Sequence, residues 1–346
     1  MTRKIGGEHG IIAGEILNPM LAVVHSKRIL RPPLDICDDM EHPDGGEVTI
    51  ESYERIEYDE PADGVGRVTM ARPGMANAQD TRMLAEMQKA FTEADRDPDI
   101  DCIILAGEGD HFSSGHDLSD EQEGRLNESF WERHDESIED QMRVEEEFFF
   151  DHAMHIRDLD TPTVASVQGN AVLAGIMIAD VCDLIVASEE AQFVNPSLRH
   201  VGTGAEVMTL PWSIGVRKTK ELLWTGDPLY AEDAKELGLI NRVVPADELE
   251  EETLYLAERI ALNPTLSLEI TKKQLNFALD QMGQADSQEY HFAMHQIVHE
   301  SKEDEEWSKE AEKRREEGGF GAWLEYRDGP FREQAKKYKK DDPHVE

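Results

Sequence analysis

The sequence predicts an α/β fold, because apolar runs with the length of buried strands alternate with segments of helical periodicity. Residues 102–106 and 163–167 are two such runs, and a glycine-containing turn follows each of them. Helical periodicity is clearest in one set of apolar residues, which are Met83, Leu84, Met87, Ala90 and Phe91. We therefore expect strands and helices to alternate around a buried core.

The expected elements follow one another closely from residue 48 onward. Strands are expected at residues 48–58 and 65–71, before the helix that contains Met83, and at residues 100–106. A long amphipathic polar stretch then covers residues 121–157. After it come a strand at 163–167, a helix at 174–179 and a strand at 184–187.

The chain divides into three expected parts. Residues 1–46 form an N-terminal extension, either an arm that packs on a neighbouring subunit or a poorly ordered tail. Residues 47–245 form the core, and residues 246–346 form a C-terminal helical region. Asp247, with Glu250 three residues later, predicts an N-cap and a capping box at the start of that region.

The charge of the chain is strongly negative. It has 35 basic and 74 acidic residues, a net charge of −39. This balance disfavours nucleic acids and anionic membranes as partners, because both repel an acidic surface. The acidic residues are expected to form a solvated surface, and adaptation to high salt, which screens self-repulsion, is the alternative.

The cysteines and the N-terminus predict a soluble, cytoplasmic protein. Cys37, Cys102 and Cys182 cannot all pair, which favours a reducing compartment. No basic, apolar, small-residue signal peptide begins the chain. The longest apolar run, residues 171–179, is too short to span a bilayer.

The turns after the two strands carry the strongest functional signal. They are residues 112–118 (FSSGHDL) and 168–175 (QGNAVLAG). A strand that ends in a small-residue turn leaves backbone N–H groups without ladder partners, and the first amides of a helix are also unpaired. Two such turns brought together predict two N–H donors for one oxygen, which is an oxyanion hole.

Several segments in the same order resemble the crotonase (enoyl-CoA hydratase/isomerase) superfamily. The resemblance rests on both turns and on residues 72–78 (RPGMANA), 183–193 (DLIVASEEAQF) and 223–239 (LWTGDPLYAEDAKELGL). It covers roughly residues 48–280. It implies a spiral of ββα units, a C-terminal helical region that builds trimers or dimers of trimers, and an acyl-CoA thioester as substrate, with no cofactor beyond that coenzyme A.

The resemblance also maps a site onto this chain. It implies that the backbone amides of His116 and Ala174 form the oxyanion hole, with alanine at a position that is usually glycine. A methyl group is tolerable there if φ is negative. The two glutamates that hydratases of the family use correspond to Met177 and Ser197. Neither residue can act as a carboxylate, so the usual addition of water is in doubt.

Glu206 is the candidate proton carrier that remains. In some isomerases of the family an acid on the loop after Ser197 moves the proton. Glu206 is the one acid in residues 195–210 of this sequence. An expected helix at residues 205–213 offers a structural alternative, since a negative charge stabilises a helix N-terminus. The imidazoles of His116 and His134 are further candidates, because histidine titrates near neutral pH.

The remaining candidates concern substrate binding and metals. Substrate and CoA contacts are expected from Arg72, Met75, Ser114, Asp117, Gly175 and Lys272, with Asp117 orienting the turn. His291, His295 and His299 share a helix face, but no known carboxylate pattern accompanies them, so packing and no metal site are expected. The Phe148–Phe149–Phe150 group is likewise expected to pack within a helix.

Two classes of function follow from these residues. The first is an acyl-CoA enzyme that stabilises a thioester enolate, as a hydratase, as an isomerase, or as a thioester or carbon–carbon hydrolase that uses Glu206 alone. The second is an inactive acyl-CoA-binding protein that has lost its chemistry with the two glutamates. The sequence favours the enzyme, because the hole and one carboxylate remain.

Overall fold

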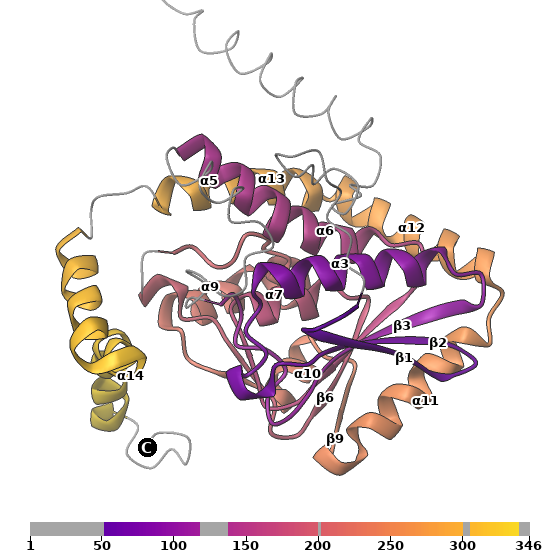
Figure 1. Ribbon diagram of the computed structural model, residues 1–346, viewed down its shortest axis with the longest axis horizontal. Helices are drawn as coiled ribbons and strands as arrows, with labels where there is room; N and C mark the ends of the chain where they lie inside the picture. Colours follow the sequence, from indigo (N-terminus) through magenta and orange to yellow (C-terminus); the bar gives the residue numbers. More distant parts are fainter. Residues whose placement is uncertain (1–51, 118–137, 200–201, 300–304, 339–346) are drawn as a thin grey trace, which may run out of the picture.

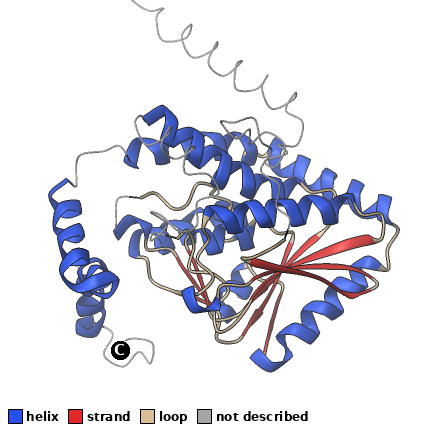
Figure 2. Ribbon diagram, in the orientation of Figure 1, coloured by secondary structure: helices blue, strands red, loops and turns tan. Residues whose placement is uncertain are grey.

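The computed structural model of the protein describes residues 52–117, 138–199, 202–299 and 305–338 (Figure 1). The expected N-terminal extension and His134 lie outside these residues. The described part mixes helices and strands as the sequence predicts (Figure 2). None of the helices described combines the length and the apolar character that crossing a bilayer requires.

A six-stranded sheet forms the centre of the molecule. Its order is β1-β2-β3-β4-β6-β9, with β1 antiparallel to β2 and the other neighbours parallel. The strands are β1 (Ile56–Ala62), β2 (Gly64–Met70), β3 (Ile100–Gly107), β4 (Thr163–Val167), β6 (Leu184–Ser188) and β9 (Arg242–Val244). A smaller sheet joins β5 (Asn170–Val172), β7 (Gln192–Val194) and β8 (Leu229–Tyr230).

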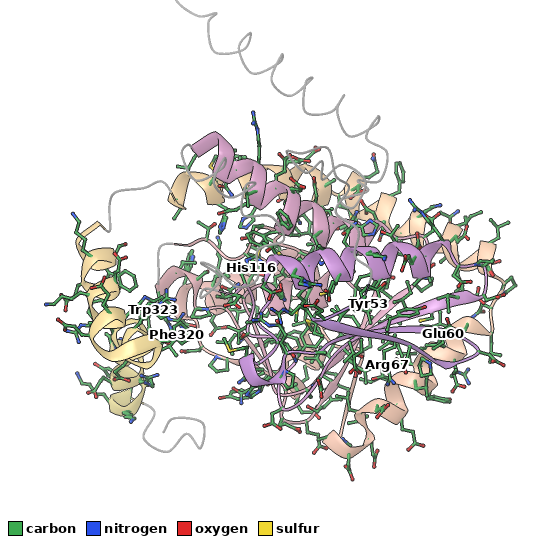
Figure 3. The ribbon with its side chains drawn as sticks, viewed as in Figure 1. Tyr53, Glu60, Arg67, His116, Phe320 and Trp323 are labelled. Atoms are coloured by element: carbon green, nitrogen blue, oxygen red, sulfur yellow. The ribbon has the colours of Figure 1, made fainter. Side chains whose placement is uncertain are left out.

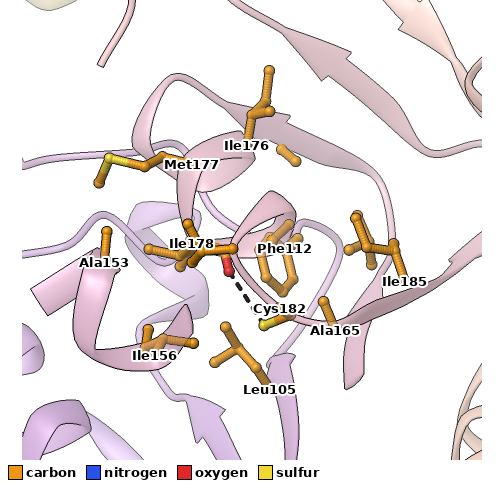
Figure 4. Close-up of a cluster of buried hydrophobic side chains, with 14 of the residues drawn as sticks. Leu105, Phe112, Ala153, Ile156, Ala165, Ile176, Met177, Ile178, Cys182 and Ile185 are labelled. Carbon is orange, nitrogen blue, oxygen red and sulfur yellow. Dashed lines mark hydrogen bonds between the residues drawn. The ribbon is translucent and has the colours of Figure 1, made fainter. Parts of the chain in front are cut away.

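Helices cover both faces of the large sheet (Figure 1). On one face lie α3 (Thr81–Arg96), α6 (Asp151–Asp158) and α7 (Ala174–Asp180), whose apolar side chains share one core with the sheet. Figure 4 shows part of this core around Phe112 and Ile178, where the thiol of Cys182 donates to the Ile178 carbonyl at 3.3 Å. On the other face α11 (Leu249–Ala261) packs against a second cluster that includes Ile104.

The remaining helices surround this core and form the C-terminal region. They are α5 (Ile138–Glu145), α8 (Leu210–Ser213), α9 (Gly215–Thr225), α10 (Ala231–Leu237), α12 (Thr265–Gln281), α13 (Gln284–His299) and α14 (Glu305–Tyr338). Helix α14 stands apart from the others in Figure 1. Arg199 connects it to the core, with its guanidinium 3.4 Å from Asp328 and above the Phe331 ring.

The structure confirms the expected helix around Met83 and the strands at 100–106 and 163–167, and it corrects three details. The first strand begins later than expected and continues through Pro61, which an edge strand tolerates because a proline there removes no ladder bond. The capping box at Asp247 is wrong, since a 3-10 turn (Ala246–Glu248) precedes α11 and makes no side-chain cap. The expected helix at residues 205–213 begins only at Leu210.

Candidate active site

The first predicted turn is held in place by the side chain of Asn77. The turn follows β3, and the Asn77 amide donates to the carbonyls of Glu108 at 2.9 Å, His111 at 2.9 Å and Phe112 at 3.1 Å. The backbone N–H of Gln79 donates to the Gly115 carbonyl at 2.8 Å. Sequence reasoning found Asn77 within a motif but assigned it no role.

The structure brings the two predicted turns into direct contact. Ser113 and Val172 are joined by a 2.9 Å bond from the Val172 N–H to the Ser113 carbonyl. A β-carbon on Gly115, whose φ is +87°, would lie 2.8 Å from the Val172 carbonyl oxygen and 3.2 Å from the Ala174 nitrogen. A β-carbon on Gly175 would lie 2.5 Å from the Ser113 carbonyl oxygen. Both positions therefore require glycine.

The backbone strain of the second turn is located one residue before Ala174. Leu173 has φ of +51° and ψ of −113°, an unfavourable region for a branched side chain. Ala174 is not among the residues with positive φ, as its methyl group requires. Ala174 is the first residue of α7, where an N–H has no acceptor within the helix and lies at the positive end of the helix dipole.

Glu206 lies beside the first turn, in the loop before α8. Its carboxylate is almost fully buried, and its Oε1 is 3.6 Å from His116 Nδ1 and 3.6 Å from His295 Nε2. Among the described residues, no side chain or backbone group hydrogen-bonds its Oε2. Burial raises the pKa of Glu206, but the two imidazoles outweigh burial and lower the pKa to about 2. The group is therefore an ionised carboxylate at neutral pH.

Helix α13 fixes the loop that carries Glu206. His295 Nδ1 lies 3.0 Å from Thr203 Oγ1, and His291 Nε2 lies 2.7 Å from the Ala205 carbonyl oxygen. The Gln288 side chain accepts from the Met208 N–H at 2.7 Å and donates to the Met208 carbonyl at 2.9 Å. The histidines of this helix therefore serve the site as well as packing. The side chain of His299 lies outside the described residues.

A π-helical turn (Glu146–Phe150) after α5 supplies the wall next to His116. The rings of Phe149 and His116 stack with centroids 3.8 Å apart, whereas Phe148 and Phe150 are buried in the core. The packing prediction therefore holds for all three phenylalanines, since Phe149 is partly buried against the cluster that contains Phe148 and also stacks on His116. Figure 3 shows His116 near the start of α3, and its side chain is partly buried.

Comparisons with known proteins identify the family of the chain. Residues 60–334 match the family model for enoyl-CoA hydratase/isomerase. The chain belongs to the enoyl-CoA hydratase/isomerase family. EchA13 of Mycobacterium tuberculosis, a curated protein with enoyl-CoA hydratase in its name, is 36% identical over 258 residues, which cover 71% of this chain and 81% of the relative.

Solved structures from the family share the fold of this hydratase/isomerase chain. An enoyl-CoA hydratase/isomerase from Xanthobacter autotrophicus Py2 is 30% identical, with a TM-score of 0.71, and the match covers 81% of this chain and 99% of that chain. An enoyl-CoA hydratase from Mycobacterium smegmatis is 28% identical, with a TM-score of 0.70 and coverages of 81% and 95%.

In this member of the hydratase/isomerase family, the two expected glutamate positions are buried and carry no acid. Met177 lies in α7 and belongs to the apolar core. Ser197 is buried after β7, and its hydroxyl has no hydrogen-bond partner among the described residues. The candidate carboxylate, Glu206, lies on a different element, the loop before α8. Sequence reasoning did not name Glu145 and assigned His295 to packing alone, because both come from helices far away in the chain.

The expected substrate contacts of this hydratase/isomerase chain occupy two regions. Around the first turn, Arg72 lies 3.0 Å from Asp117 and 3.2 Å from Asp80, Ser114 donates weakly to the Met75 carbonyl, and Met75 is half exposed. Lys272 is buried, with its ammonium 2.7 Å from Asp183. Both basic charges already have carboxylate partners, and their contact with CoA phosphates stays a prediction.

Proposed function

We propose that the protein shifts a double bond within an acyl-CoA thioester, with Glu206 as the base that removes and returns the proton. One observation carries this proposal: an ionised, buried carboxylate with an oxygen unpartnered among the described residues lies next to the turn that bears the His116 amide. Family membership supplies the acyl-CoA substrate class.

In the proposed mechanism the backbone polarises the substrate and the side chain moves the proton. The N–H groups of His116 and Ala174 donate to the thioester oxygen and stabilise the enolate that forms when a neighbouring carbon loses its proton. Glu206 accepts that proton and delivers it to another carbon of the same conjugated system. Atoms balance without water, and the chemistry needs no cofactor besides the coenzyme A of the substrate.

A single carboxylate suits this reaction better than hydration. Hydratases of the family hold the adding water between two glutamates, and the corresponding positions are Met177 and Ser197 here. A carboxyl group with a pKa of about 2 is a strong acid and a weak base, so it relies on the hole to make the carbon proton acidic.

The test is a reaction in deuterated water, with enoyl-CoA thioesters of several chain lengths and products followed by mass. We expect a moved double bond with deuterium incorporation and no added water. A gain of the mass of water would identify a hydratase, and release of free coenzyme A a hydrolase. Bound thioester with no exchange would identify an inactive binding protein. Any of these three results would overturn the isomerase proposal.

We also propose that the protein assembles as a trimer or a dimer of trimers. The support is an exposed apolar face on α12, where Leu266 is 65% exposed and Phe277 is 63% exposed. The apolar residues Leu254, Leu256, Ile260 and Leu262 of the C-terminal region also predict, from the sequence, a face buried between subunits. The first three instead pack against the chain's own sheet. The candidate interface therefore moves from α11 to α12.

A further inference from the structure

Next to the proposed base lies a buried group of side chains with the composition of a metal site. One oxygen from each of Glu145 and Glu206 and one ring nitrogen of His295 lie within 4.8 Å of one another. The three residues come from α5, from the loop before α8 and from α13, and each is less than 9% exposed. Among the described residues, this is the group whose ligand atoms converge in this way.

Hydrogen bonds from the surrounding protein orient two of the three side chains, those of His295 and Glu145. His295 places Nδ1 on the Thr203 hydroxyl, 3.0 Å away, which leaves Nε2 directed at Glu206. The Gln296 amide donates to Glu145 Oε2. Metal-binding histidines and carboxylates are held in this manner, with the second atom of each ligand fixed by a hydrogen bond from the protein.

An independent observation points to a ligand at this place. Glu206 Oε2 is buried, and no described group hydrogen-bonds it. Two carboxylates this close together and this far from water repel each other without solvent screening. A cation between them would complete the coordination of the free oxygen and neutralise the repulsion.

We propose that Glu145, Glu206 and His295 form a site for one divalent transition-metal ion, Zn²⁺ or Mn²⁺, whose binding blocks the proposed base. Two carboxylates with one imidazole suit these ions. Bond lengths of about 2.0–2.2 Å require the three ligand atoms to move closer together, which rotation of the glutamate side chains provides. The fourth position remains open to water.

The site itself is independent of the proposed function, whereas its effect on turnover rests on it. An ion bound to Glu206 withdraws negative charge from its carboxylate and so lowers the basicity that proton transfer needs. Metal binding and proton transfer therefore oppose each other at this carboxylate. The ion therefore inhibits turnover, although none of its three ligands lies in the two turns proposed to bind the thioester oxygen.

The test is metal binding by the full chain, stripped with a chelator and titrated with Zn²⁺ or Mn²⁺ against a chromophoric competitor. Excess Mg²⁺ saturates weak sites on the acidic surface. We expect one tightly bound ion per chain, and at least about 100-fold weaker binding in Glu145→Gln and His295→Gln, beyond the range for losing an outer-shell partner. The matched control is Glu146→Gln, which removes the carboxylate next to Glu145 in the sequence, and we expect it to keep wild-type affinity for the ion.

Several outcomes overturn the proposal. One is the absence of a stoichiometric ion in the wild-type protein, and another is equal binding by Glu145→Gln and Glu146→Gln. Thermal unfolding shows whether each variant is folded. If Glu145→Gln does not fold, the metal affinity of His295→Gln tests the proposal instead. A wild-type chain that binds the ion but shows no isomerase turnover leaves the metal site standing and rejects the proposed function. Turnover that is unchanged by a bound ion rejects the inhibition.

Discussion

Glu206 is the residue on which the proposed chemistry depends. Replacing Glu206 with Gln keeps the size of the side chain and its hydrogen bonding but removes its ability to carry a proton. Because a general acid or base contributes about 10²–10⁴-fold, we expect Glu206→Gln to lower kcat by this factor and leave the Kd of the thioester nearly unchanged. Steady-state kinetics and calorimetry measure the two quantities.

The fold of this variant needs its own control, since Glu206 is buried between two imidazoles. An unchanged melting temperature together with a low kcat separates chemistry from packing. Normal turnover would exclude Glu206 as the base, and His134 would then be the next candidate to test by substitution. Unfolding would identify Glu206 as a structural residue.

In the proposed mechanism His116 donates through its backbone amide, and its ring affects the pKa of Glu206. We expect His116→Ala to keep activity within about tenfold at neutral pH, because the amide survives, whereas losing a donor costs about 10²–10³-fold. The ring helps to lower the pKa of Glu206. Its removal therefore raises that pKa and moves the acid limb of the kcat/KM profile to higher pH. A loss of several orders of magnitude at neutral pH would place the imidazole in the chemistry.

Among the elements, the two turns of the proposed oxyanion hole tolerate the least change. Gly175→Ala places a β-carbon 2.5 Å from the Ser113 carbonyl oxygen, so the turns must separate. We expect kcat to fall by about 10²–10³-fold, the loss of one donor, together with a lower melting temperature. Gly74→Ala is the matched control, because nothing lies within 4 Å of its added carbon. Equal activity of the two variants would contradict the assignment of the hole.

Helix α6 carries a histidine that makes stability depend on pH. His152 is fully buried with Nδ1 3.1 Å from Gln88 Oε1, and burial lowers its pKa to about 3. The unfolded chain therefore binds more protons than the folded chain between about pH 6.5 and 3. Stability is fully present above pH 6.5 and falls by up to about 1.4 kcal/mol per pH unit below it. Denaturant unfolding measured at several pH values over this range should show that the free energy of unfolding of His152→Gln depends less on pH than that of the wild-type chain. An unchanged pH dependence would contradict the assignment.

The elements also show what the sequence could predict. Strands such as β3 and β4 are continuous apolar runs flanked by turns, and α3 shows clear periodicity, so local patterns suffice for them. The contact between the two turns was predicted through the family resemblance. Glu145 was not found and His295 was assigned to packing alone. Their approach to Glu206 depends on how α5 and α13 pack, and no local pattern encodes the packing of distant helices.

At the scale of the whole molecule, the apolar face of α12 predicts association. Leu266→Glu and Phe277→Glu place a charge on this face, and we expect each to convert the trimer to monomers by light scattering, since burying an unpaired charge is costly. Gln274→Glu introduces the same charge at an exposed polar position of α12 and keeps the trimer. A wild-type chain that is monomeric at moderate salt, where its net charge of −39 is screened, would contradict the assembly.

The two edge strands of the large sheet disfavour association of chains by strand pairing. β1 is one edge, where Glu57, Asp59 and Glu60 are exposed and Pro61 offers no N–H. β9, the other edge, is only three residues long. Charged, interrupted or very short edges do not template a further strand. Growth of the sheet from one molecule into the next is thereby suppressed, which protects a crowded protein against fibrillar aggregation and leaves helix faces as the route to discrete assemblies.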